Sequence, residues 1–302
     1  MSISGESINL LKTLSNQLAD AVALVSPALV QVNGRQRQSA SGVVFAPDLI
    51  MTADHVLERE DNITIVTHDG RTLEAAFVGR DISTDLAVLK VSDLNISPAN
   101  VATEDARVGQ LALAIGRPDG NVMASSGIVS AVGGPLRFRS GGTLEKYLQT
   151  DATPYPGFSG GPLIDVEGLV LGILTTGLAR GVTLSIPASI ALASASTLSQ
   201  QGYIKRGYLG ISSQAVEIPA AQRAGREQEH GLLIVRVDAD TPAAGGGMLL
   251  GDILLSLDGQ KVDSVEDLQA LLTGERVGKA VAVEVIRGGQ LQTLTVTIGQ
   301  RK

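Results

Sequence analysis

The stretch Pro156-Gly157-Phe158-Ser159-Gly160-Gly161-Pro162 decides how this chain is interpreted. It places one serine among glycines, so the backbone can turn sharply and direct several N–H groups at one point. A serine nucleophile needs both properties, because its Oγ must be exposed and main-chain donors must meet the oxyanion. The same residue types also form ordinary turns between strands. Other features of the sequence must therefore distinguish a nucleophile loop from a plain turn.

Composition narrows the class of protein. The chain has 302 residues, of which 44% are hydrophobic and 18% charged, which suits a well-cored protein of two domains and argues against disorder. A net charge of −7 disfavours nucleic-acid partners and adhesion to anionic membranes. The sequence has no cysteine, which excludes disulfides and thiolate chemistry. The three histidines, His55, His68 and His230, show no metal-ligand spacing, so we expect neither metal nor cofactor.

The N-terminal segment has neither the basic start of an export signal nor an apolar run long enough to span a bilayer. We therefore expect a cytoplasmic protein, or one whose leader has been removed. Within this segment, residues 8–25 carry apolar side chains at three- and four-residue spacing and predict an amphipathic helix. This helix either packs on its own domain or serves as an oligomerisation arm.

The remaining sequence predicts a mainly β protein with two domains. Residues 27–200 alternate short β-prone runs with glycine-rich turns, as in a barrel or sandwich, and end in a helical run. A linker at 201–206 leads to a smaller unit of mixed α/β pattern over residues 207–302. Residues 1–26 form a helical arm ahead of both.

Chain order tests the nucleophile hypothesis. A serine nucleophile needs a base, and the base needs a partner that fixes its tautomer. Taken singly, His55 would be structural and Asp85 a turn or cap residue, but together with Ser159 they follow the chymotrypsin order. The Gly-x-Ser-x-Gly pattern also occurs in α/β-hydrolases. That fold needs a histidine after the serine and alternating parallel strands, and only His230 is available.

Three stretches extend this pattern: Thr52-Ala53-Asp54-His55-Val56, Thr84-Asp85-Leu86-Ala87-Val88-Leu89-Lys90, and Gln149-Thr150-Asp151-Ala152 with Gly157-Phe158-Ser159-Gly160-Gly161-Pro162-Leu163. They resemble the histidine, aspartate and serine motifs of the HtrA/Deg family of trypsin-like serine proteases with one C-terminal PDZ domain. The resemblance covers about residues 20–300. It implies a chymotrypsin-like double β-barrel followed by a small α/β PDZ domain. It also implies an ATP-independent endopeptidase of unfolded or damaged proteins.

The resemblance further implies residue roles. Ser159 would be the nucleophile, His55 its general base and Asp85 the orienting acid. The N–H groups of Gly157 and Ser159 would form the oxyanion hole. The substrate pocket would be lined from Pro154, Tyr155, Thr175, Thr176, Gly177 and Thr183. None of these is acidic, so we expect small or medium apolar side chains at the cleaved position rather than Lys or Arg.

Two departures from the family pattern bear on activity. Phe158 stands where the family usually has Asn, and a bulky side chain there would alter access on the leaving-group side. Pro154 and Pro156 restrict the backbone around the loop, which either preforms the oxyanion hole or locks it shut. The alternative function is therefore a catalytically silent HtrA-like chaperone or scaffold that binds polypeptides.

In the second unit, Tyr208-Leu209-Gly210-Ile211 resembles the carboxylate-binding loop of PDZ domains. Such a loop captures a peptide C-terminus with successive N–H groups while the peptide adds to the sheet as a strand. A plain strand start is the simpler interpretation of these residues. Family resemblance also implies a homo-oligomer, a trimer, and a periplasmic or envelope location if a leader was removed. The expected partners are unfolded polypeptides and peptide C-termini.

Overall fold

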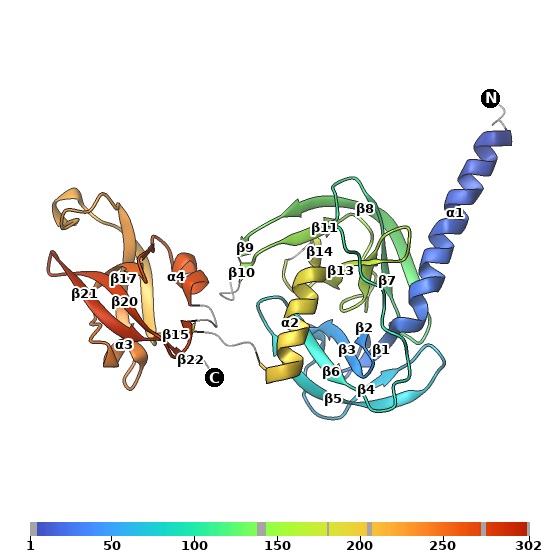
Figure 1. Cartoon of the computed structure of the whole chain (residues 1–302), viewed down its shortest axis with the longest axis horizontal. Helices are drawn as coiled ribbons and strands as arrows, with labels where there is room; N and C mark the ends of the chain where they lie inside the picture. The colour runs from blue at the N-terminus through green and yellow to red at the C-terminus, as the bar shows by residue number, and fades with distance from the viewer. Residues whose placement is uncertain (1–4, 138–142, 180, 204–206, 273–275, 301–302) are drawn as a thin grey trace. The chain divides into compact units, whose positions relative to one another are not determined.

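The computed structural model describes residues 5–137, 143–179, 181–203, 207–272 and 276–300. Two compact units, Met1–Ile204 and Lys205–Lys302, divide the chain (Figure 1). The predicted linker at 201–206 lies partly outside the described residues, because residues 204–206 are not among them.

The first unit is built on two closed barrels of antiparallel strands, with the strand orders β1-β2-β3-β6-β5-β4 and β11-β14-β13-β12-β7-β8. Short runs rich in buried Val, Ile, Leu and Ala form these strands, and closure leaves no exposed sheet edge. The mainly β double-barrel fold predicted from the sequence is therefore confirmed. The N-terminal barrel comprises β1 (Leu29–Asn33), β2 (Ala40–Ala46), β3 (Leu49–Ala53), β4 (Ile63–Val66), β5 (Thr72–Asp81) and β6 (Leu86–Lys90).

The C-terminal barrel comprises β7 (Leu111–Gly116), β8 (Met123–Gly133), β11 (Tyr147–Thr150), β12 (Pro162–Ile164), β13 (Val170–Thr175) and β14 (Thr183–Pro187). A small hairpin of β9 (Leu136–Arg137) and β10 (Thr143–Leu144) extends from it. All six residues of β13 are buried, so this strand crosses the interior of the unit. Its last residue, Thr175, reaches the site described below.

The helix α1 (Gly5–Val25) begins before the range predicted from periodicity and ends at the same residue. Near its C-terminus, Ala21 and Val25 are each only 3% exposed and pack on the barrels, whereas Leu10 and Leu11 are 72% and 59% exposed. Figure 1 shows the N-terminal turns extending away from the barrels. An oligomerisation role for this helix stays a prediction. Among the helices described, none is both long and apolar enough to cross a membrane.

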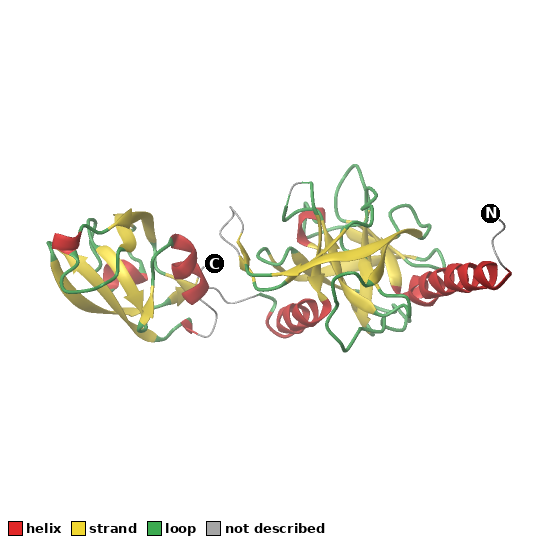
Figure 2. Ribbon diagram, turned by 90° about the horizontal axis from the view of Figure 1, so that it is seen from above, coloured by secondary structure: helices red, strands yellow, loops and turns green. Residues whose placement is uncertain are grey.

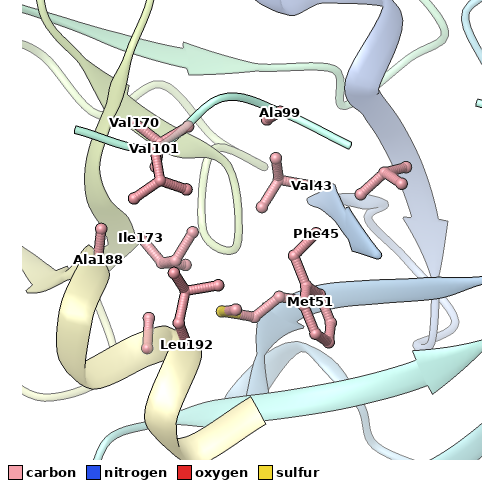
Figure 3. A pocket seen from close by; sticks show the side chains of 11 residues that line it. Val43, Phe45, Met51, Ala99, Val101, Val170, Ile173, Ala188 and Leu192 are labelled. Atoms are coloured by element: carbon pink, nitrogen blue, oxygen red, sulfur yellow. The ribbon is translucent and has the colours of Figure 1, made fainter. Parts of the chain in front are cut away.

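The helix α2 (Ala188–Gln201) closes the first unit and packs into the core shared by the two barrels. Gly202 ends the helix with a left-handed φ of 76°, and its N–H donates to Leu198 O at 2.7 Å. An apolar pocket remains where α2 meets β2, β3 and β13 (Figure 3). Its lining, which includes Met51, Ile173 and Leu192, is apolar throughout and offers no side-chain polar group to orient a ligand.

The second unit is a sheet with the order β16-β17-β18-β20-β21, on which β19 pairs with β18, together with the two-stranded sheet β15-β22. Strands dominate both units, as Figure 2 shows. Ser264 caps the helix α4 (Val265–Leu271) with a capping box, since its Oγ accepts from Asp267 N–H at 3.2 Å and Asp267 accepts from Ser264 N–H at 2.9 Å.

The elements of this unit are β15 (Gly207–Tyr208), β16 (Ile211–Glu217), β17 (His230–Val237), α3 (Pro242–Gly245), β18 (Ile253–Leu257), β19 (Gln260–Lys261), α4 (Val265–Leu271), β20 (Ala280–Arg287), β21 (Gln290–Thr297) and β22 (Gly299–Gln300). One face of the main sheet buries an aliphatic core that includes Leu232, Val283 and Val296. The strand β16 lies at the edge of the sheet, and α4 runs beside it.

Candidate active site

His55 and Asp85 meet because two neighbouring strands of the N-terminal barrel place them together. β3 pairs with β6 so that Ala53 lies opposite Leu86. The chain then leaves β3 in a short 3₁₀ turn, Asp54–Val56, which carries His55, while Asp85 immediately precedes β6. The His55 Nδ1 atom lies 2.7 Å from Asp85 Oδ2. An ionised carboxylate only accepts hydrogen bonds, so Nδ1 carries the proton and Nε2 is left as the acceptor.

The Asp85 carboxylate is held on several sides. Its side chain is 6% exposed, and Oδ1 accepts from the backbone N–H of His55 at 2.9 Å. Oδ2 accepts a second hydrogen bond from the hydroxyl of Thr175, at the end of β13. Thr175 Oγ1 in turn accepts from Gly177 N–H at 3.0 Å. These donors fix the Asp85 carboxylate in the orientation that meets His55 Nδ1.

The turn before Asp85 fixes its backbone in an uncommon conformation. Asp85 has a left-handed φ of 54°, and its carbonyl accepts from Asp54 N–H at 2.9 Å. The carboxylate of Asp81 holds the turn by accepting from Ser83 Oγ at 2.6 Å and Thr84 Oγ1 at 2.8 Å. A conformation of this kind persists only where the surroundings enforce it. The polar residues Asp81, Ser83 and Thr84, which suggested a turn at this position, therefore set the orientation of the Asp85 carboxylate.

Ser159 lies in the loop before β12, in the C-terminal barrel. Its Oγ is 3.1 Å from Thr176 Oγ1, and the residue is 7% exposed. Glycine is needed on both sides: Gly157 has a φ of 89°, and a Cβ on Gly160 would lie 2.2 Å from Ser41 O. The Phe158 carbonyl accepts from Gly161 N–H at 2.8 Å. Because a trans peptide directs its C=O and N–H oppositely, the N–H of Ser159 points away from that bond.

Phe158 does not face the leaving-group side of the site. It is 1% exposed and packs in the core of the C-terminal barrel, where Tyr155 meets it edge-on at 5.4 Å. The turn that donates from Phe158 N–H to Tyr155 O at 3.0 Å directs this side chain inward. The expectation that Phe158 alters access on the leaving-group side is therefore wrong. Burying such a side chain contributes about 2–3 kcal/mol to stability and anchors the loop.

The residues predicted to line the substrate pocket have different surroundings. Thr176 and Gly177 are exposed beside Ser159 and the His55–Asp85 pair, and a Cβ on Gly177 would lie 2.6 Å from His55 Nδ1. Thr175 is only 1% exposed, and its hydroxyl serves Asp85. Tyr155 is 41% exposed and Thr183 is 8% exposed, while Pro154 is half-buried. A pocket built by these residues stays a prediction.

Asp54 adds a second acidic group next to the pair. Its side chain is mostly buried, and Oδ1 lies 3.0 Å from Arg80 Nη1, which also holds Glu60 through Nη2 at 3.1 Å. Burial raises the pKa of Asp54 above 3.8, although Arg80 opposes the shift. Nearby Asp85 raises the pKa of Asp54 further. In the parts of the chain that the structure describes, no group of three or more His, Asp or Glu residues could hold a metal ion.

In the second unit, the stretch Tyr208–Ile211 runs from the end of β15 through Leu209 and Gly210 into β16, and two of its carbonyls are anchored. Leu209 O accepts from Ala243 N–H at 2.8 Å, and Gly210 O accepts from Asp238 N–H at 2.9 Å. The following N–H groups, of Gly210 and Ile211, therefore point away from those bonds. Gly210 has a φ of 82°, and a Cβ there would lie 2.3 Å from Thr241 Cβ. The loop leads directly into the edge strand β16.

Comparison with known proteins places both units. A model of the trypsin-like peptidase domain matches residues 40–173, and a model of the PDZ domain matches residues 207–298. Curated proteins named "Probable periplasmic serine endoprotease DegP-like", from Halomonas elongata and Pseudomonas savastanoi pv. phaseolicola, are 38% and 37% identical over 90% and 88% of this chain. The chain spans 59% and 57% of the length of these two relatives.

Solved structures are similar over nearly the whole chain. The HtrA-type protease AlgW with a decapeptide is 30% identical with a TM-score of 0.77, over 94% of this chain and 99% of that one. A serine endoprotease from Yersinia pestis is 31% identical with a TM-score of 0.76, over 95% of this chain and 98% of that one. Both domains and their order along the chain are therefore shared with these structures.

Proposed function

The chain belongs to the HtrA family of trypsin-like serine proteases that carry a PDZ domain, and we propose that it is an ATP-independent serine endopeptidase of unfolded or damaged polypeptides. The observation that carries the proposal is the 2.7 Å contact between His55 Nδ1 and Asp85 Oδ2, next to Ser159 in a glycine-bounded loop. Peptide hydrolysis by such a group needs no nucleotide, metal or other cofactor.

In the proposed mechanism, Ser159 Oγ attacks the scissile carbonyl while His55 Nε2 takes the hydroxyl proton. Asp85 keeps the ring in the required tautomer and stabilises the imidazolium that forms. His55 then gives the proton to the leaving amine. A water molecule, activated by the same histidine, hydrolyses the acyl-enzyme. The multiple donors to Asp85 support this assignment, because they hold the carboxylate in place against His55.

The oxyanion hole would be formed by the N–H groups of Gly157 and Ser159. The direction of Ser159 N–H, opposite the bonded carbonyl of Phe158, supports its part in the hole. Loss of one donor of this kind typically costs about 3 kcal/mol of transition-state stabilisation. The buried side chain of Phe158 supports a loop that is held in one conformation rather than remodelled for each substrate.

The primary pocket would be formed from Pro154, Tyr155, Thr176 and Gly177 with Thr183, and Thr175 would contribute backbone. Its residues are neutral, which supports cleavage after small or medium apolar side chains. A basic side chain at that position would find no acidic partner among them. We expect the substrate to enter as an extended segment, which an unfolded polypeptide provides.

The second unit would bind peptide C-termini. The anchored loop Tyr208–Ile211 would receive the terminal carboxylate on the N–H groups of Gly210 and Ile211, and the peptide would add along β16 beside α4. Such binding would recruit substrates or regulate the protease unit. By analogy with relatives named periplasmic, we propose a location in the periplasm or cell envelope. We also propose a homo-oligomer, a trimer by family resemblance.

The test is digestion of a permanently unfolded substrate such as casein, without nucleotide, by the whole chain and by Ser159→Ala. We expect cleavage by the parent chain, inhibition by a fluorophosphonate, and no cleavage by Ser159→Ala or of a tightly folded control protein. Binding of casein without cleavage by the parent chain would overturn the proposal. It would favour instead the silent chaperone or scaffold that the two prolines suggested.

A further inference from the structure

One buried hydroxyl on the N-terminal barrel is bonded to the nucleophile loop of the C-terminal barrel. Ser41, on β2, is 0% exposed, and its Oγ donates to the carbonyl of Gly157 at 2.8 Å. Its backbone N–H donates to the carbonyl of Ser159 at 3.2 Å. A single residue thus holds the loop on both sides of Phe158, across 116 residues of sequence.

The direction of the side-chain bond is fixed by a second donor. The backbone N–H of Arg117 lies 2.8 Å from Ser41 Oγ and can only donate to it. The single hydroxyl proton of Ser41 is therefore available for Gly157 O. Gly116 leaves room for this hydroxyl, since a Cβ there would lie 2.9 Å from Ser41 Oγ. Ser41 O is also engaged, because it accepts from Thr52 Oγ1 at 2.7 Å.

Arg117 is itself immobilised. The residue is 5% exposed, and its guanidinium donates to Ser26 Oγ at 2.8 Å and to Ser26 O at 3.1 Å, just after α1. Burial lowers the pKa of Arg117. The donor that orients the Ser41 hydroxyl is therefore part of a rigid segment rather than of a free loop.

We infer that Ser41 is a positioning residue for peptide hydrolysis, which holds the Gly157 carbonyl so that the loop keeps its oxyanion donors in place. This inference rests on the proposed function. A carbonyl fixed at Gly157 sets the peptide plane that follows it, whose N–H closes the turn onto Tyr155 O. Gly157 has a left-handed φ of 89°, and its Cα lacks the side chain that would otherwise limit rotation. An outside bond is therefore needed to keep the glycine in one state.

The test compares Ser41→Ala with Ser185→Ala. Ser185 is a matched control, because it is also 0% exposed in the same unit but its Oγ has no hydrogen-bond partner. With a short peptide substrate, we expect Ser41→Ala to lower kcat about 10- to 100-fold, a part of the loss typical of a missing oxyanion donor, with KM within about twofold. Ser185→Ala should keep both constants within about twofold.

If the Ser41 hydroxyl had only a structural role, Ser41→Ala would lower Tm and leave kcat of the folded enzyme unchanged. That result would overturn the inference. Should Ser41→Ala not fold, Ser41→Cys takes its place. Its thiol is a weaker donor of similar size, so we expect an intermediate loss of kcat. Unchanged kcat in that variant would equally contradict the positioning role.

Hydrogen exchange separates this inference from the proposed function. In the Ser159→Ala background, no chemistry occurs, and we expect Ser41→Ala to speed amide exchange of Phe158 at least about tenfold, with Ser185→Ala unchanged. Failure of the parent chain to cleave casein would refute the protease while leaving this exchange test intact. Equal exchange in both variants would refute the positioning role even in an active protease.

Discussion

The loop around Ser159 and the loop within Tyr208–Ile211 are both buried turns that contain a left-handed glycine, but they differ in the groups that hold them. Each contains a glycine in the left-handed region, Gly157 at 89° and Gly210 at 82°, and each glycine faces an atom that a Cβ would strike. Each loop also anchors a side chain in a core, since Phe158 is 1% and Leu209 is 2% exposed. Both therefore present backbone N–H groups from an otherwise buried turn.

The two loops differ in what holds their carbonyls. Around Gly157, a side chain from the opposite barrel, Ser41, supplies the donor. Around Gly210, backbone N–H groups of the same small unit do so, and the next strand lies at a sheet edge. Under the proposed function, the loop that would meet the transition state is braced from outside its own barrel, whereas the loop that would accept a peptide strand keeps one side open.

We expect the largest effect on activity from Gly157→Ala. The substitution forces a Cβ to within 2.4 Å of Pro118 Cβ and disfavours the observed φ. We expect kcat/KM for a short peptide substrate to fall about 10²- to 10³-fold, the loss typical of one oxyanion donor. Steady-state kinetics checks this, with near-native Tm required. A folded Gly157→Ala enzyme with parent activity would show that this glycine does not shape the hole.

We expect the largest effect on stability from removing the Phe158 side chain, which anchors the loop in the core of the C-terminal barrel. Phe158→Ala leaves a cavity among Leu163, Leu174 and their neighbours. We expect it to lower the free energy of unfolding of the first unit by about 3–5 kcal/mol, as for other buried aromatics. Denaturant titration measures this loss. A loss below about 1 kcal/mol would mean that the side chain does not fill the core as described.

In the second unit, we expect Gly210→Ala to weaken peptide binding without lowering the cleavage of short substrates. A Cβ there meets Thr241, which shifts the loop that would hold a carboxylate. We expect affinity for a peptide with a free apolar C-terminus to fall at least about tenfold, the value of one lost charge-assisted hydrogen bond. Fluorescence anisotropy measures it, with the C-terminally amidated peptide as control. Cleavage of short substrates that do not engage the loop should be unchanged.

The smallest effect concerns Asp54. Its folded-state pKa lies above 3.8, mainly because of burial, so ionisation is less favourable in the folded protein than in the unfolded chain. The resulting cost is absent at pH below 3.8 and develops as the pH rises through the folded pKa. We therefore expect Asp54→Asn to raise Tm by about 1–3 °C at pH 7 and by less as the pH falls toward about 4. A Tm gain that grows on acidification would contradict this sign.

Much of the fold and of the site follows from local patterns. The short β runs predicted a barrel or sandwich, and the motifs around His55, Asp85 and Ser159 carried the family resemblance that implied a double barrel. The bonds from Thr175 to Asp85 and from Ser41 to Gly157 join residues 90 and 116 positions apart. No local signal marks Ser41 or Thr175, because their partners are set only when the barrels close.

The local sequence also does not predict where the Phe158 side chain packs. Its neighbour Ser159 is recognisable from sequence, but the side on which Phe158 packs depends on the turn that Tyr155 O and Gly161 N–H complete. A bulky residue beside a nucleophile suggests obstruction when only spacing is known. The structure shows that the residue belongs to the core, so its bulk supports the loop instead.

The central claim, that Ser159 is a nucleophile activated by His55 and Asp85, is tested most directly by labelling with a fluorophosphonate probe followed by peptide mapping. We expect rapid modification of the parent chain at Ser159 and none in Ser159→Ala. We also expect labelling slowed by several orders of magnitude in His55→Ala. Parent-chain labelling no greater than that of Ser159→Ala, with both proteins folded, would show that Ser159 is not an activated nucleophile.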